Sequence, residues 1–180
     1  MEKDGEMKSP PKKIKPVPWM VPGAIVFLKE IIGKIQVPSG RMPDVIETGS
    51  GGSTLFFQEH CNLISFEHNR RWFNAVDTYL ERDSYDRTYI DLRFDPEYPK
   101  KGLRNLRCMK FDIALIDGRG RVKSIMDIIP HMADGGWIIL DNAERPRYRP
   151  AVKHLNSICD TKASFTKHWT TTFWKVKYKR

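Results

Sequence analysis

The stretch from Asp44 to Asn69 constrains the fold of this chain more than any other: DVIETGSGGSTLFFQEHCNLISFEHN. A short apolar strand leads into a glycine-rich turn and a helix-like segment, and a second strand then ends at Glu67. Two strands joined through a helix predict a right-handed crossover and a parallel sheet. Ligands of such sheets bind beyond the carboxyl ends of the strands, where the glycine turn and Glu67 are expected to lie.

The remainder of the chain continues this alternation of strands and helices. Apolar periodicity predicts helices over 24–35, 53–60, 122–132 and 148–158, and a further helix that Asn69 caps. Strands are predicted over 44–47, 62–67, 88–94, 111–117 and 135–142, with two closing strands over 163–169 and 173–178. We therefore expect an α/β fold: a Rossmann-like, doubly wound, mostly parallel seven-stranded sheet with helices on both faces and a C-terminal antiparallel hairpin.

Length and composition favour one globular domain over residues 17–180, preceded by a flexible basic tail over residues 1–16. Three scattered cysteines argue against a zinc site and a disulfide framework. The most apolar early stretch, 17–28, is interrupted by two prolines and a glycine and is too short to span a bilayer. We expect a cytoplasmic protein without a membrane partner, and the sequence leaves the oligomeric state undetermined.

The glycine turn and Glu67 together predict a ligand that contains a nucleoside. Glycines allow the backbone to turn tightly beside a ligand, and a carboxylate at the end of the neighbouring strand can accept both hydroxyl groups of a ribose. A dinucleotide site usually shows G-x-G-x-x-G, but the third glycine is replaced here by Thr54. An NAD-dependent oxidoreductase is therefore an alternative that the sequence disfavours.

The pattern E-x-G-x-G-x-S-T resembles the first motif of the class I S-adenosylmethionine (SAM)-dependent methyltransferases. The stretches SFEHN, FDIALIDGR and GGWIILDN resemble the ends of the family's second, fourth and fifth strands. The resemblance implies a SAM site in which Gly49 and Gly51 approach the amino-acid part of the cofactor and Glu67 holds its ribose. The cofactor-binding residues that it implies are Glu47, Gly49, Ser50, Gly51, Ser53, Thr54, Glu67, His68 and Asp117. Glu47 either orients the turn or meets the cofactor ammonium through water, and Asp91 and Asp95 are candidates for the adenine contact.

Three polar residues after the fourth and fifth strands are candidates for catalysis. Asp117 and the pair Asp141-Asn142 are similar to the magnesium site of the catechol and caffeoyl-coenzyme A O-methyltransferases. The resemblance therefore implies that these residues hold Mg²⁺ or act on the acceptor directly. The continuations DGRGR and DNAERPRY depart from those enzymes, so a role in shaping the loops, with Asp117 as a helix N-cap, stays open.

Basic residues concentrate after the same two strands. Arg119, Arg121 and Lys123 follow the fourth strand, and Arg145, Arg147 and Arg149 follow the fifth. Guanidinium groups bind carboxylates and phosphates, so we expect Arg119, Arg145 and Arg147 to bind an anionic acceptor, unless these cations pair with nearby acids. The predicted activity is O-methyl transfer to a small acidic or phosphorylated sugar-type molecule. The formal charge of +9 keeps open a nucleic-acid-binding or nucleic-acid-modifying protein on the same scaffold.

Overall fold

In the computed structural model, residues 10, 13–80, 89–97, 106 and 109–177 are described. Within them the helices are α1 (Pro22–Ser39), α2 (Gly52–Gln58), α3 (Arg70–Asp77), α4 (Arg121–Ile128) and α5 (Arg149–Ile158), with short 3₁₀ helices η1 (Ile129–His131) and η2 (Pro146–Tyr148). The strands are β1 (Asp44–Thr48), β2 (Asn62–Glu67), β3 (Ile90–Phe94), β4 (Phe111–Ile116), β5 (Met132–Leu140), β6 (Cys159–Thr166) and β7 (Thr170–Val176).

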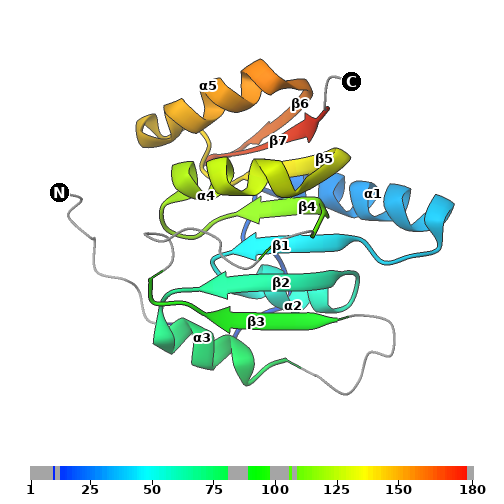
Figure 1. The fold of residues 1–180 in the computed structure, drawn as a ribbon. Coiled ribbons are helices and arrows are strands. Elements are labelled where there is room, and N and C mark those ends of the chain that lie inside the picture. The colour runs from blue at the N-terminus through cyan, green and yellow to red at the C-terminus, as the bar shows by residue number, and fades with distance from the viewer. Residues whose placement is uncertain (1–9, 11–12, 81–88, 98–105, 107–108, 178–180) are drawn as a thin grey trace.

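The strands form one sheet in the order β3-β2-β1-β4-β5-β7-β6 (Figure 1). Neighbours from β3 to β5 pair in parallel, whereas β7 runs antiparallel to both β5 and β6. The expected seven-stranded, mostly parallel sheet with a closing hairpin is confirmed. The common dinucleotide-binding order 3-2-1-4-5-6 has no such reversed strand between its fifth and last strands.

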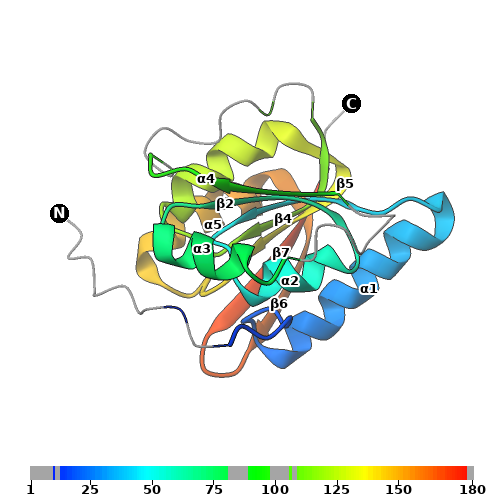
Figure 2. The same cartoon turned by 90° about the horizontal axis from the view of Figure 1, so that it is seen from below.

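Helices cover both faces of the sheet, with α4 and α5 on one side and α1, α2 and α3 on the other (Figure 2). Successive strand residues alternate between the two faces. Ile46, Ile64 and Ala114 belong to the core beneath α4 and α5. Their neighbours Val45, Leu63 and Ile113 belong to the core beneath α1 and α2. This double burial explains why the parallel strands are almost continuously apolar in the sequence.

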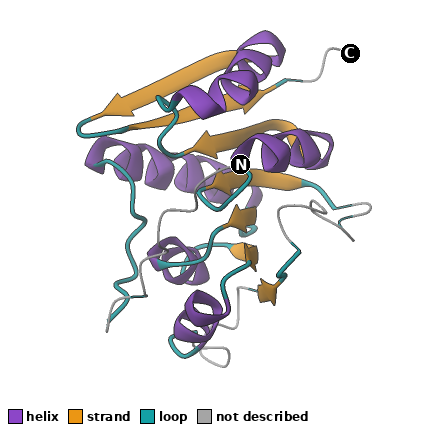
Figure 3. Ribbon diagram, turned by 90° about the vertical axis from the view of Figure 1, so that its left-hand side faces the viewer, coloured by secondary structure: helices purple, strands orange, loops and turns teal. Residues whose placement is uncertain are grey.

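The parallel strands end at one edge of the sheet, which Figure 3 shows facing the viewer. Two backbone hydrogen bonds continue the ladder past the strand ends, from Gly49 N to Phe66 O (2.9 Å) and from Asp117 N to Thr48 O (3.0 Å). The loops after β1, β2 and β4 therefore leave the sheet side by side. This arrangement fixes the positions of the side chains that the sequence analysis singled out.

Several element boundaries differ from the sequence-based expectation. The helix expected over 122–132 ends at Ile128, because Pro130 cannot continue an α-helix, and Met132 already belongs to β5. The strand expected over 88–94 begins at Ile90, and most of the loop expected over 98–110 lies outside the described residues.

The beginning of the chain differs as well, because Ile14, expected in a flexible tail, is only 6% exposed and packs with Leu55, Val76 and Leu92. Residues 1–9, 11 and 12 of that tail lie outside the description. In the described part of the chain, no helix combines the length and the apolar character needed to cross a membrane.

Candidate active site

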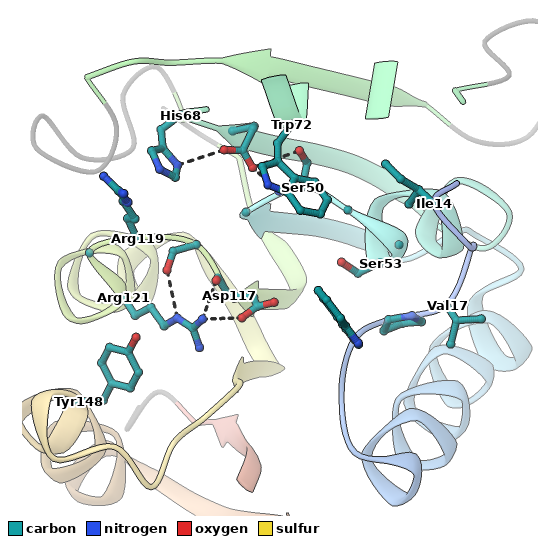
Figure 4. Close-up of a pocket in the computed structure, with 18 of the residues that line it drawn as sticks. Ile14, Val17, Ser50, Ser53, His68, Trp72, Asp117, Arg119, Arg121 and Tyr148 are labelled. Carbon is teal, nitrogen blue, oxygen red and sulfur yellow. Dashed lines mark hydrogen bonds and ion pairs between the residues drawn. The ribbon is translucent and has the colours of Figure 1, made fainter. Parts of the chain in front are cut away.

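A cavity of about 1230 Å³ opens at the carboxyl edge of the sheet (Figure 4). Its walls come from the loops after β1, β2 and β4, from the first turns of α2, α3 and α4, and from η2. A further wall is an N-terminal segment that we call the strap (residues 13–19). The lining residues are Lys13, Ile14, Lys15, Val17, Pro18, Trp19, Gly49, Ser50, Gly51, Gly52, Ser53, Glu67, His68, Trp72, Asp117, Gly118, Arg119, Gly120, Arg121, Val122, Lys123, Arg147 and Tyr148. The volume lies above the roughly 300–1,000 Å³ of typical ligand pockets.

The three glycines of the turn have different structural roles. Gly49 has a φ of 87°, and a Cβ atom there would lie 2.7 Å from the Cα atom of Gly118. Gly52 lies under the strap: a Cβ atom there would collide with the carbonyl oxygen of Val17 and approach that of Lys15 to 2.6 Å. At Gly51 a Cβ atom would meet nothing within 4 Å, so this glycine faces open space in the cavity. The backbone around Gly51 is therefore the part of the turn that a ligand can approach.

Glu47 is buried behind the turn and holds the turn in place through hydrogen bonds. Its carboxylate accepts hydrogen bonds from the hydroxyls of Ser53, Thr54 (2.6 Å) and Ser65 (2.7 Å), and Thr54 in turn accepts one from Gly51 N (2.8 Å). Burial raises the pKa of Glu47 to about 7, while the three hydroxyl donors oppose that rise. Neither Glu47 nor Thr54 lines the cavity, so the structure favours turn orientation for both rather than cofactor contact.

Glu67 lies at the end of β2 with its carboxylate at the cavity wall. One oxygen accepts a hydrogen bond from Ser50 N (3.0 Å), and the other accepts one from Asn69 N (2.7 Å) and lies 3.1 Å from His68 Nδ1. These contacts hold the carboxylate against the glycine turn, and Asn69 caps α3 as expected. Ser50, Ser53, Glu67 and His68 all line the cavity, so the structure brings these four predicted cofactor-binding residues together.

Arg121 occupies the space between the ends of β4 and β5. Its guanidinium donates to Asp117 Oδ1 (2.6 Å), Asp117 O (2.7 Å) and Asp141 O, and its Nε donates to Gly118 O (3.0 Å). The side chain of Arg121 is only 9% exposed. A buried cation thus lies where the sequence suggested Mg²⁺.

The magnesium expectation for Asp117, Asp141 and Asn142 is not supported by this arrangement. Asp141 Oδ1 accepts hydrogen bonds from Trp169 Nε1 (3.0 Å) and Thr171 Oγ1 (2.6 Å), which tie β5 to the closing hairpin. Neither Asp141 nor Asn142 lines the cavity, and Asn142 has a left-handed φ of 54° in the turn after β5. The described residues contain no group of three or more His, Cys, Asp or Glu side chains that could hold a metal ion.

Asp117 remains at the cavity, with about a third of its side chain exposed into it. Burial raises its pKa to about 6, the Arg121 cation opposes that rise, and Asp141 adds to it. One carboxylate oxygen is engaged by Arg121, and the group titrates close to neutral pH. Asp117 is therefore the described carboxylate best suited to exchange a proton with a molecule in the cavity.

Two of the three arginines expected to bind the acceptor line the cavity. Arg119 and Arg147 do so, and the Arg147 guanidinium lies 4.9 Å from the centre of the Tyr148 ring. Arg145 does not line the cavity, and its Nε lies 4.0 Å from a carboxylate oxygen of Glu144. The adenine candidates also lie elsewhere, because Asp91 pairs with Arg93 (2.7 Å) and Asp95 accepts from Glu97 N (2.8 Å).

The sequence analysis missed the cavity residues of the strap, as well as Trp72 and Tyr148. Trp72 lies in α3, for which the sequence predicted a capped helix but no cavity residue. The strap shows no periodicity, and its basic and proline-rich composition is also typical of a tail. The sequence signal that could have revealed the strap is the second glycine of the Gly51-Gly52 pair, which a turn alone does not require.

The fold and the position of the cavity permit comparison with known proteins. No family model matches the sequence, and a comparison with curated proteins finds no significant match. Among solved structures, a methyltransferase-like protein from Silicibacter pomeroyi DSS-3 superposes with a TM-score of 0.68 at 19% identity, covering 92% of this chain and 90% of that one. This chain has the fold of the class I SAM-dependent methyltransferases.

Two further structures with the methyltransferase fold illustrate its range. A putative O-methyltransferase from Klebsiella pneumoniae has a TM-score of 0.64 at 14% identity, covering 84% of this chain and 80% of its own. The N-methyltransferase NodS from Bradyrhizobium japonicum WM9, in complex with S-adenosylhomocysteine (SAH), has a TM-score of 0.55 at 12% identity, covering 84% of this chain and 87% of its own. Their names differ in the acceptor atom, so the fold does not determine the acceptor.

Proposed function

We propose that the protein is a SAM-dependent methyltransferase that transfers a methyl group to an oxygen atom of a small anionic acceptor. The observation that carries the proposal is the Glu67 carboxylate, held beside the open backbone of Gly51 in one large cavity. A carboxylate in this position can accept hydrogen bonds from the two hydroxyls of a ribose. Ser50 and Ser53 offer hydroxyl groups to the rest of the cofactor, and Trp72 offers an aromatic surface in the same cavity (Figure 4).

The residues around Asp117 fit a proton-accepting role in this reaction. When bound, SAM supplies a methyl group that its positively charged sulfur has already activated. The Asp117 carboxylate takes the proton of an acceptor hydroxyl, and its pKa of about 6 keeps it ionised at neutral pH. Arg121 holds one oxygen of Asp117 in place, which leaves the other for the acceptor. The side chains around the cavity hold the acceptor in line with the methyl group.

The charges of the cavity support an anionic acceptor. Among the described residues, six basic and two acidic side chains line it. Arg121 is paired with Asp117, and Lys123 lies 2.8 Å from Asp127. Arg119 and Arg147 offer planar groups that match a carboxylate or a phosphate, such as that of an acidic or phosphorylated sugar. A nucleic acid is the second candidate acceptor, favoured by the formal charge of +9.

Substitution of Glu67 tests the cofactor site. In Glu67→Ala, the affinity for SAH measured by calorimetry should fall by roughly 1.5–3 kcal/mol, the usual cost of losing hydrogen bonds to a charged group. Glu59→Ala is a matched control, because Glu59 is exposed at the end of α2 and lies outside the cavity. SAH binding that is equal in both variants, or absent in the wild type, would contradict the proposed function.

A further inference from the structure

We infer that the strap is the acceptor-selecting wall of the cavity, and that the acceptor carries a ring, which stacks on Trp19, next to the anionic group that Arg119 and Arg147 bind. The inference rests on the proposed function and adds the shape of the acceptor to it. It depends on how the strap is anchored, on the exposure of Trp19, and on the position of the strap across the cavity from the arginines.

The strap is anchored at both ends. At one end Ile14 is buried with Leu55, Val76 and Leu92. At the other end Met20 and Val21 are 6% and 2% exposed and pack with the residues of α1 and α2. Between these anchors the strap crosses directly over Gly52, where only a glycine leaves room for the carbonyl of Val17. Residues 15–19 therefore form a fixed wall rather than a loose end.

Trp19 is 76% exposed although it belongs to that wall. An exposed tryptophan leaves a large apolar surface in contact with water, and a flat ligand that covers it gains both burial and ring stacking. The neighbouring Val17 is 51% exposed and also lines the cavity, as does Pro18. An anchored indole beside two apolar side chains provides a platform for a ring.

Arginine side chains lie across the cavity from the strap. Figure 4 shows Ile14 and Val17 on one side and Arg119, Arg121 and Tyr148 on the other, with Asp117 between them. Glu67, which is assigned to the cofactor, lies 3.1 Å from His68 Nδ1, and Figure 4 shows His68 far from Val17. On one side, a molecule that spans the remaining space meets Val17, Pro18 and Trp19 of the strap, together with its Lys13 and Lys15. On the other side it meets Arg119 and Arg121, and Asp117 lies between the two sides. A ring that bears a phosphate or a carboxylate and a hydroxyl matches all three.

Titration of small probes into the protein saturated with SAH tests the inference. The probes are phenyl phosphate, glucuronate and cytidine monophosphate, each paired with its uncharged counterpart: phenol, glucose and cytidine. Glycerol 3-phosphate serves as an anion without a ring. At least one anionic ring should bind at least tenfold more tightly than both its uncharged counterpart and glycerol 3-phosphate.

Variants of the strap then locate the binding. Trp19→Ala should weaken that probe about tenfold and leave SAH affinity unchanged, and Trp19→Phe should restore most of the loss. Tyr89→Ala is the matched control, because Tyr89 is an aromatic residue that is 61% exposed and lies outside the cavity. Its affinity for the probe should equal that of the wild type.

The outcomes separate the two proposals. Failure of SAH to bind would overturn the proposed function and with it the acceptor site. If SAH binds but no anionic ring does, or if Trp19→Ala and Tyr89→Ala are indistinguishable, the inference about the strap is wrong and the cofactor assignment stands. Equal binding of glycerol 3-phosphate would also overturn it, because the anion alone would then account for the affinity.

Discussion

Arg121 is a buried cation whose guanidinium nitrogens all donate to groups at the ends of β4 and β5. Its partners are carbonyl oxygens of both strand ends and the carboxylate of Asp117, and its guanidinium carbon also lies 5.2 Å from the centre of the Tyr148 ring. A buried charge is tolerated only when its hydrogen bonds are satisfied, as they are here. In the sequence, Arg121 was one of the basic residues grouped after the fourth and fifth strands. In the structure it links the ends of those two strands.

Replacement of Arg121 by methionine should destabilise the protein by about 3 kcal/mol, because it leaves Asp117 without its cation and several buried carbonyls without donors. The free energy of unfolding in urea measures the effect. Lys123→Met is the matched control: it removes a more exposed ion pair with Asp127 on the same helix, and such pairs contribute about 0–1 kcal/mol. Equal losses in the two variants would show that Arg121 does not have this structural role.

Glu47 predicts a pH dependence of stability. Its pKa is raised from an ordinary value of 4.5 to about 7, so the folded state binds the proton more tightly than the unfolded state does. Its contribution is therefore fully present below pH 4.5 and is lost as the pH rises through about 7. In Glu47→Gln, which cannot ionise, this loss is absent. Urea unfolding across the range from pH 4.5 to 7 measures the effect. The unfolding free energy of the variant minus that of the wild type should rise as the pH rises through this range. A difference that is constant with pH contradicts the assignment.

At the scale of the elements, the backbone of the strap packs directly against the first residue of α2, Gly52. Gly52→Ala should displace the strap, because the new methyl group would collide with the backbone carbonyls of Lys15 and Val17 and not with a flexible side chain. We expect faster tryptic cleavage after Lys13 and a lower midpoint of thermal unfolding. Gly33→Ala is the matched control, since a Cβ atom at Gly33 inside α1 would meet nothing within 4 Å. That variant should keep the wild-type cleavage rate and be slightly stabilised, because alanine favours helix.

The sequence predicted the type and order of these elements because each has a strong local signal. Asn69 caps α3 as expected, and the apolar runs of β1, β2, β4 and β5 follow from burial on both faces. The end of α4 was misjudged, because apolar periodicity continued past Pro130 into a strand. Ile14 could not be predicted, since its burial depends on contacts with Leu55, Val76 and Leu92, which are far away in the sequence.

The same limit applies to the candidate site. Glu67 and the glycine turn were predicted because a fixed spacing on a βαβ unit positions them. The pairing of Arg121 with Asp117 and the tethering of Asp141 by Thr171 depend on how β4, β5 and β7 meet, and sequence spacing does not specify those contacts. Residues of one type, such as Arg119, Arg121 and Arg145, therefore have different surroundings although they lie in similar sequence contexts.

For the whole molecule, the full sequence carries a formal charge of +9, and the described basic residues differ in how they are paired. At the edge of the sheet away from the cavity, Arg41 is held by Asp112 at 2.7 and 2.8 Å and lies 3.3 Å from Asp44. At the cavity edge, six basic side chains accompany two acidic ones. The resulting field attracts anions of any size, and its effect falls with ionic strength.

This electrostatic field predicts how the protein binds a nucleic acid. A random single-stranded 20-mer should bind weakly, with a dissociation constant of about 10⁻⁴–10⁻⁶ M near physiological salt, and the affinity should fall steeply as salt is raised. Because general attraction does not use the cofactor or the strap, SAH and Trp19→Ala should leave this affinity unchanged. Fluorescence anisotropy at two salt concentrations, with and without SAH, measures all of these effects. If SAH tightens oligonucleotide binding tenfold and Trp19→Ala abolishes that gain, the strap stacks on a base, nucleic acid is the acceptor, and the proposal of a small anionic acceptor is wrong.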